Sequence, residues 1–189
     1  RYAFLFNEYI GNKYVYLPEL SLRYTGQKTF QFDNSHKTIA LYLGGENKEF
    51  RKYPDEYAVQ LLRLLNRQGY NLLLIGDEND NIKHTQYAEE ARIDHLINLT
   101  ARTTIEGFIN TIANVDLIIT IDSSALHIAA AVKTPFIALM GLSTSPTSTI
   151  LPKVPLGRIL KIENNLIREE DYIRNITPDL ILKTISELI

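Results

Sequence analysis

The 189-residue chain contains no cysteine. This absence excludes a disulfide scaffold, a zinc site built on thiolates and catalysis by a cysteine nucleophile. An excess of one charge is also lacking, because 20 Lys and Arg residues stand against 22 Asp and Glu residues, for a net charge of −2. A chain with this balance has no global basic field, so we expect no nucleic-acid partner.

Long apolar runs are missing too, since no stretch approaches the roughly 18 consecutive apolar residues of a membrane-spanning helix. Three motifs are absent: the GxGxxG turn of dinucleotide-binding domains, the GxxxxGKS/T phosphate loop and the GxSxG nucleophile elbow. The four histidines show no spacing with carboxylates that is typical of a zinc site. With 45% apolar and 22% charged residues, the composition is that of an ordinary globular domain.

From residue 37 onward, the sequence alternates between predicted strands and predicted helices. Short apolar runs that end in loops predict strands at 39–43, 71–75, 95–99, 116–121, 135–140 and 158–162. Apolar residues three and four positions apart, with Pro or Thr at the start, predict helices at 54–69, 103–114 and 177–189. A polar helix is predicted at 79–92 and a small Ala-rich helix at 124–132. Runs such as NLLLI and DLIITI are typical of strands buried on both faces. The sequence therefore predicts an α/β fold with a Rossmann-like, doubly wound parallel sheet.

Residues 1–36 differ from the rest, because they are crowded with Tyr and Phe and show no sustained period. Short extended pieces are predicted around 14–17 and 29–32. We interpret 1–36 as a linker and the remnant of an amino-terminal domain, and 37–189 as one domain. Since the chain begins with Arg1, we also interpret it as a piece of a longer protein.

The loop after the first predicted strand has residues suited to a phosphate. Gly44 and Gly45 let the backbone come close to a ligand, and Lys48, Arg51 and Lys52 precede the start of a helix. Backbone N–H groups, the helix dipole and a guanidinium together favour an anion. The alternative is a solvated turn with ordinary surface cations.

The segment after the fourth predicted strand is a second candidate site. Ser123 and Ser124 stand at a helix start, where their hydroxyl and amide groups can cap the helix or hold an anion. His127 falls on the first helical turn, and Asp122 can accept a hydrogen bond from a sugar or orient the serines. A capped helix with a half-buried histidine explains the same residues.

Two further loops follow predicted strands. The acids of loop 76–80, among them Glu78, can hold ribose hydroxyls at the carboxyl end of a strand, or stand at the positive end of a helix. Loop 141–149 is rich in hydroxyl groups and long enough to close over a ligand, although most such loops are only loops.

Four segments between 38 and 151 carry a family resemblance. The stretch LYLGGENKEFRKYP is similar to a strand followed by a His-Pro-Gly-Ala-like turn, a Lys-bearing loop and a Trp-Pro helix start. LTARTTI is similar to Leu-x-Gly-x-Thr-Ser-Leu, and TPFIALMG to a Thr-Pro strand that ends in Phe-Gly. The most specific match is VDLIITIDSSALHIAAA, which is similar to a family segment that has an Asp-Ser-Gly-x-Met-His turn before three alanines. The chain resembles the carboxyl-terminal domain of glycosyltransferase family 9, the ADP-heptose:lipopolysaccharide heptosyltransferases and their relatives.

The resemblance implies a GT-B architecture of two Rossmann-like domains, in which residues 37–189 bind the nucleotide-sugar donor without a metal ion or other cofactor. Arg51 stands where the family has a phosphate-binding Lys, and Glu78 where it has an acid that reaches the ribose. The turn at 122–124 stands at the family's phosphate-contacting position, with a histidine beside it. The donor-binding residues are then Gly44, Gly45, Arg51, Lys52, Glu78, Asp122, Ser123, Ser124 and His127.

The chain departs from the family pattern at several positions. Ser124 replaces a Gly whose bare backbone lets the diphosphate approach, and Arg51 replaces Lys, which keeps the charge and changes its geometry. The family's acceptor site and catalytic carboxylate lie in the amino-terminal domain. We therefore expect no catalytic residue in this chain and no transfer by the chain alone.

The sequence thus predicts the donor-binding half of a bacterial glycosyltransferase. It would transfer a heptose or related sugar from a nucleotide diphosphate sugar, ADP-heptose foremost, to a lipopolysaccharide or surface-glycan acceptor. The acceptor, a lipid-linked glycan, would bind through the missing domain, and the parent would be cytoplasmic, peripheral on the inner face of the inner membrane. Two alternatives stay open: another GT-B enzyme that uses a UDP-sugar, as transferase or epimerase, and a degenerate, non-catalytic binding domain.

Overall fold

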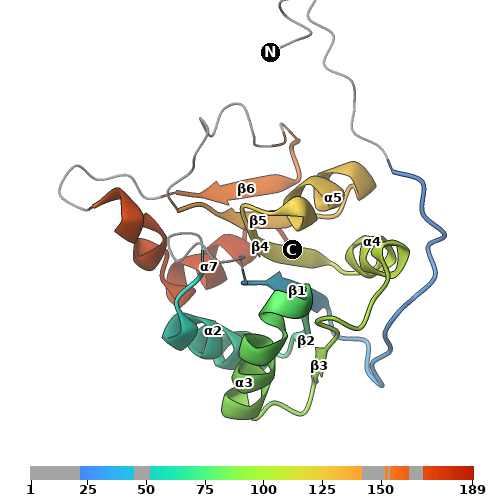
Figure 1. Cartoon of the computed structure of the whole chain (residues 1–189), viewed down its shortest axis with the longest axis horizontal. Helices are drawn as coiled ribbons and strands as arrows, with labels where there is room; N and C mark the ends of the chain where they lie inside the picture. Colours follow the sequence, from blue (N-terminus) through green and yellow to red (C-terminus); the bar gives the residue numbers. More distant parts are fainter. Residues whose placement is uncertain (1–21, 45–51, 142–151, 153, 162–167) are drawn as a thin grey trace, which may run out of the picture.

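The computed structural model describes residues 22–44, 52–141, 152, 154–161 and 168–189. In these ranges six parallel strands form one sheet in the order β3-β2-β1-β4-β5-β6 (Figure 1). The strands are β1 (Thr38–Tyr42), β2 (Asn71–Leu74), β3 (Leu96–Asn98), β4 (Leu117–Ile121), β5 (Phe136–Leu139) and β6 (Gly157–Leu160). The helices are α2 (Asp55–Arg67), α3 (Asn81–Ala91), α4 (Ile105–Ala113), α5 (Ser124–Val132) and α7 (Pro178–Ile185), with 3-10 helices η2 (Glu78–Asp80) and η3 (Glu169–Asn175).

Helices cover both faces of this sheet. On one face α2 packs against α3 and α7, and on the other face α4 and α5 pack together (Figure 1). The chain moves outward from β1 to β3, then returns to the other side of β1 and moves outward again from β4 to β6. In a sheet with this topology, ligands bind beyond the carboxyl ends of the strands, near the point where the strand order reverses. The predicted doubly wound α/β fold is confirmed.

The central strands carry the core. β1, β2, β4 and β5 are buried at every residue, as their uninterrupted apolar runs predict. The edge strands β3 and β6 are only partly buried, because each has a neighbour on one side alone. Fully buried side chains such as Leu41, Leu73 and Ile119 each contribute about 1.5–3 kcal/mol. None of the helices in the described ranges has the length and apolarity needed to cross a membrane.

The ends of α2 follow the predicted signals. The helix starts directly after Pro54, with Asp55 and Glu56 in its first turn, where acids interact favourably with the helix dipole. It ends before Gly69, whose φ of 81° is a left-handed conformation that glycine adopts without strain. The N–H of Tyr53 donates to the carbonyl oxygen of Leu43 at 3.4 Å, which places the start of the helix at the carboxyl edge of the sheet.

The predicted helix at 79–92 begins instead as the 3-10 helix η2 and continues as α3. The cause is a reciprocal cap. The carboxylate of Asp77 accepts a hydrogen bond from the backbone N–H of Asn79 at 2.8 Å, and the carboxylate of Asp80 accepts one from the N–H of Asp77 at 3.2 Å. This tight turn holds Asp80 beside the ends of β1 and β2.

The helix predicted at 103–114 forms as α4, but Ile105, which fits its apolar period, is 82% exposed. Ile105 is the first residue of the helix, next to the capping Thr104, and lies outside the packed part. Ile112 is buried as predicted, but the polar Asn110 and Thr111 are buried with it.

A neighbouring segment explains those buried polar residues, because residues 25–29 lie along α4. The amide of Asn110 accepts a hydrogen bond from the N–H of Gly26 at 3.0 Å and donates to the hydroxyl of Thr25 at 2.8 Å, and the hydroxyls of Thr29 and Thr111 lie 2.6 Å apart. The extended piece predicted at 29–32 forms no strand, and the piece at 14–17 lies outside the described residues. The division of the chain after residue 36 stays a prediction.

Candidate functional site

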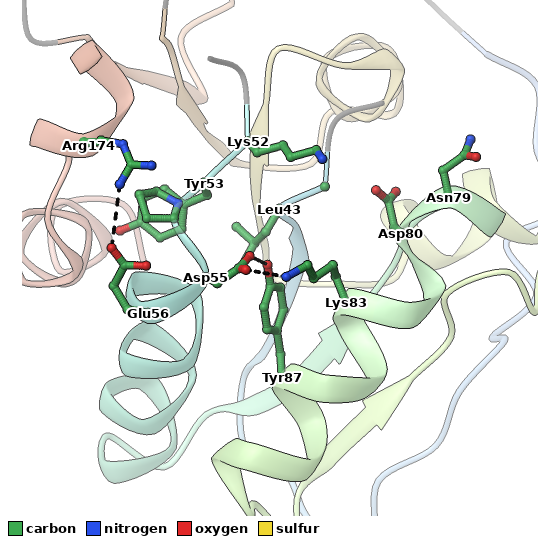
Figure 2. Close-up of a pocket in the computed structure, with 12 residues that line it drawn as sticks. Leu43, Lys52, Tyr53, Asp55, Glu56, Asn79, Asp80, Lys83, Tyr87 and Arg174 are labelled. Atoms are coloured by element: carbon green, nitrogen blue, oxygen red, sulfur yellow. Dashed lines mark hydrogen bonds and ion pairs between the residues drawn. The ribbon is translucent and has the colours of Figure 1, made fainter. Parts of the chain in front are cut away.

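A pocket of about 220 Å³ lies beside the carboxyl ends of β1 and β2 (Figure 2). The residues that follow β1 form its floor, and the start of α2 contributes one wall, from Lys52 to Glu56. Residues of η2 and α3 contribute the opposite wall, and Arg174 of η3 reaches it from the carboxyl-terminal segment. Because parallel strands end at the same edge, this is where the fold itself leaves room for a ligand.

One buried carboxylate, that of Asp80, stands at the centre of this edge. Asp80 is only 5% exposed and lies against the backbones of Gly44 and Gly76, the residues that follow the strand ends. A Cβ atom on Gly44 would overlap the carboxylate, and one on Gly76 would lie 2.6 Å from its Oδ2 atom. The glycine at 44, predicted to let a ligand approach, thus makes room for an acid of the protein itself.

A second acid holds the start of α2 to α3. Lys83 donates to Oδ2 of Asp55 at 2.5 Å, and the Tyr87 hydroxyl donates to Oδ1 at 2.5 Å (Figure 2). Partial burial alone would raise the pKa of Asp55, but these two hydrogen bonds and the charges of Lys83 and Lys52 outweigh it and lower that pKa. Burial and the bond to Asp55 raise the pKa of Tyr87, so its hydroxyl stays a donor.

The turn between β4 and α5 lies across the switch point from Gly44, because β1 and β4 are neighbours. Ser123 takes the position before the first helical residue, yet its hydroxyl lies 2.9 Å from that of Thr120 and makes no cap to the helix. Ser124 and His127 are exposed, so the alternative of a half-buried histidine is wrong.

The predicted site residues thus fall into three groups. Gly44 and Lys52 line the pocket. Gly45 and Arg51 lie outside the described residues. The third group lies at the same edge of the sheet without lining the described pocket, and consists of Glu78, Asp122, Ser123, Ser124 and His127. Their assignment to donor binding stays a prediction.

The family resemblance indicates Glu78 as the acid of this loop and does not indicate Asp80. Glu78 is exposed on η2, whereas Asp80, two residues later, is buried and lines the pocket. The signal was present in the sequence as two glycines that each follow a strand, because both leave space for the same carboxylate. Among the described residues, no group of three or more His, Asp or Glu side chains is arranged to hold a metal ion.

Behind the pocket, His84 of α3 is fully buried. Its Nδ1 lies 2.7 Å from the Thr100 hydroxyl, and its ring packs near that of Tyr87. Burial lowers the pKa of His84 to about 4, against the opposing charge of Asp77, so the imidazole is neutral at neutral pH. His84 therefore packs behind the pocket wall and does not line the pocket.

A wholly parallel sheet whose strand order reverses beside β1, with a polar pocket at its carboxyl edge, defines a Rossmann-like domain. The comparison with protein families makes this more specific. The model described as "Glycosyltransferase family 9 (heptosyltransferase)" matches residues 1–170. The chain belongs to glycosyltransferase family 9, as the motifs predicted.

Curated relatives agree with this family. Lipooligosaccharide heptosyltransferase 2 of Haemophilus influenzae is 31% identical over 158 residues, which cover 77% of this chain and 45% of that protein. Lipopolysaccharide heptosyltransferase 2 of Salmonella typhimurium is 25% identical over 172 residues, 85% of this chain and 49% of that protein. The chain therefore spans about half the length of the curated relatives it matches.

Solved structures show the same fold. The structure of the ADP-heptose lipopolysaccharide heptosyltransferase II of E. coli superposes with a TM-score of 0.70 at 24% identity, over 81% of this chain and 46% of that one. The E. coli heptosyltransferase WaaC, solved with ADP, gives a TM-score of 0.69 at 16% identity, over 83% of this chain and 46% of that one.

Proposed function

We propose that this chain is the donor-binding half of a bacterial glycosyltransferase that transfers a heptose or related sugar to a lipopolysaccharide or surface-glycan acceptor. The observation that carries the proposal is the pocket at the carboxyl edge of a family 9 fold, beside the point where the strand order reverses. The curated relatives that match this chain over about half of their own length are heptosyltransferases.

The proposed donor is a nucleotide diphosphate sugar, with ADP-heptose as the first choice. Structures with the same fold were solved with ADP and with ADP-2-deoxy-2-fluoro heptose in WaaC of E. coli. In this chain the diphosphate would lie along the carboxyl edge of the sheet, between Lys52 and the start of α5. Cations and helix N–H groups there stabilise the negative charge that develops on the leaving diphosphate.

The remaining steps are assigned to the other half of the enzyme. A carboxylate outside this chain takes the proton of the acceptor hydroxyl, whose oxygen attacks the anomeric carbon with inversion as the bond to the diphosphate breaks. The acceptor is a lipid-linked glycan, so we place the whole enzyme in the cytoplasm, at the inner face of the inner membrane. By itself the chain would bind donor and transfer nothing.

Calorimetric titration of the chain with ADP, UDP, GDP and CDP tests the donor assignment. Selective binding of ADP is expected, weakened at least tenfold, or about 1.4 kcal/mol, in Arg51→Ala or Lys52→Ala. Lys183→Ala is the matched control, because Lys183 lies in the last turn of α7 and outside the pocket lining. Selective UDP binding would leave the family intact and overturn the donor, and no binding of any nucleotide would contradict donor binding by this chain.

A further inference from the structure

The carboxyl-terminal segment brings a cation to the pocket from a part of the chain that the sequence motifs do not cover. Arg174 lies near the end of η3 and lines the pocket beside Tyr53 and Glu56 (Figure 2). We propose that Arg174 binds a phosphate group of the nucleotide diphosphate and so determines the affinity of the pocket for diphosphates. This rests on the proposed function, because it assigns a further residue to the same donor site.

The backbone that carries Arg174 is anchored on both sides. Ile173 is 2% exposed and Ile176 is fully buried. The buried hydroxyl of Tyr53 donates to the carbonyl oxygen of Ile176 at 2.9 Å. Since Tyr53 directly follows Lys52 in the chain, this bond fixes the segment to the pocket wall that also carries Lys52. The backbone at Arg174 is therefore held at the pocket before a ligand arrives, and only the side chain has to be ordered on binding.

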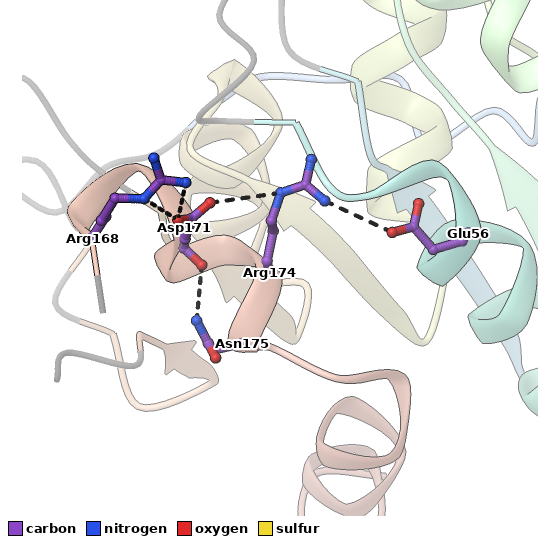
Figure 3. A network of polar contacts seen from close by, with 5 residues as sticks. All are labelled: Glu56, Arg168, Asp171, Arg174 and Asn175. Atoms are coloured by element: carbon purple, nitrogen blue, oxygen red, sulfur yellow. Dashed lines mark hydrogen bonds and ion pairs between the residues drawn. The ribbon is translucent and has the colours of Figure 1, made fainter. Parts of the chain in front are cut away.

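The guanidinium itself is weakly held. It lies 3.8 Å from Oε1 of Glu56 and 3.9 Å from Oδ1 of Asp171, and its side chain is 61% exposed (Figure 3). Both distances exceed the roughly 2.7–2.9 Å of a charge-assisted hydrogen bond. Asp171 is instead bound closely by Arg168, at 2.8 and 2.9 Å. Arg174 thus gives up little when it turns toward a phosphate, and its planar fork can bind two phosphate oxygens at once.

The charge of the pocket favours a further cation, because three acids line it beside Lys52 and Lys83. Asp55, Glu56 and Asp80 already line it, and a diphosphate would bring further negative charge into the same space. Lys83 is committed to Asp55 at 2.5 Å. Arg174 differs from Lys83 because its contacts with acids are long and exposed, so its guanidinium can pair with a phosphate of the ligand instead.

The test compares ADP binding to the wild-type chain, Arg174→Ala and Arg168→Ala by calorimetry at several salt concentrations. Arg168 is the matched control, because it belongs to the same segment and pairs with the same acid but does not line the pocket. Arg174→Ala is expected to weaken ADP binding at least tenfold and to flatten its dependence on salt, whereas Arg168→Ala stays within twofold of the wild type. Arg174→Lys should recover only part of the loss, because it keeps the charge without the fork.

A second variant tests the idea from the opposite direction. Glu56→Gln removes an acid that competes for Arg174 and repels phosphate, so ADP binding should become at least twofold tighter. If the wild type binds ADP and Arg174→Ala binds it with an affinity within twofold of the wild type, the role of Arg174 is overturned and the proposed function stands. A wild-type chain that binds none of ADP, UDP, GDP and CDP would overturn both.

Discussion

Gly44→Ala is expected to destabilise the fold through one specific neighbour, Asp80. The added Cβ would overlap the Asp80 carboxylate, which must then leave the space between Gly44 and Gly76. The displaced carboxylate loses its hydrogen bond from the N–H of Asp77, now 3.2 Å long. Overpacking costs about 1–3 kcal/mol and the lost cap about 1–2 kcal/mol, so we expect the free energy of unfolding to fall by about 2–5 kcal/mol.

Urea unfolding followed by circular dichroism measures this loss in Gly44→Ala, Asp80→Ala and the double variant. Asp80→Ala removes the group that the new Cβ would meet, at a cost of about 1–2 kcal/mol for the lost cap. Adding Gly44→Ala to Asp80→Ala should therefore cost little more, so the coupling free energy between the two positions should be about as large as the cost of Gly44→Ala alone, about 2–5 kcal/mol.

Strict additivity of the two substitutions would refute this reasoning, because it would mean that the methyl group at 44 does not meet the carboxylate at 80. A double variant with the stability of Asp80→Ala alone would support it. Equal slopes of the unfolding curves with urea are needed for the comparison, since they show that the change lies in the native state.

Two further predictions concern the sheet edge and α3. A Cβ on Gly157 would overlap the buried ring of Phe136, so Gly157→Ala should lower the melting temperature and the free energy of unfolding, the latter by about 1–3 kcal/mol. Adding Phe136→Leu should restore part of this loss. An unchanged melting temperature in Gly157→Ala would contradict the close packing. In the folded protein the pKa of His84 is about 4, below its ordinary value of 6.5. Between these two pH values the unfolded chain binds a proton at His84 that the folded chain does not, so the free energy of unfolding falls as the pH falls. Urea unfolding should give about 2 kcal/mol less stability at pH 5 than at pH 7, and His84→Gln should remove most of this difference; an equal dependence in the variant would assign it to other groups.

The sequence was sufficient to locate the strands and helices because their signals are local. Short uninterrupted apolar runs bounded by turn residues favour buried parallel strands, and the six predicted strands end within two residues of those observed. The helix ends were also predicted from local signals. Pro54 precedes α2 and Gly69 follows it, and the hydroxyl of Thr177 caps α7 by accepting a hydrogen bond from the N–H of Leu180 at 3.3 Å.

Local signals failed where a distant segment decides the burial of a residue. Ile105 fits the apolar period of its helix and is exposed, while Asn110 fits a surface position and is buried under residues 25–29. Periodicity assumes that one face of a helix meets the core, and it cannot register a polar segment that covers another face.

The fold class, the family motifs and the edge of the sheet at which a ligand can bind follow from the sequence, because strand, turn and cap signals lie in neighbouring residues. The set of side chains that share the pocket follows from tertiary packing. Asp80 enters the pocket because two glycines that follow different strands leave space for one carboxylate, and Arg174 enters it because Tyr53 binds the backbone at Ile176. Both depend on pairings between segments far apart in the chain, which no local pattern encodes.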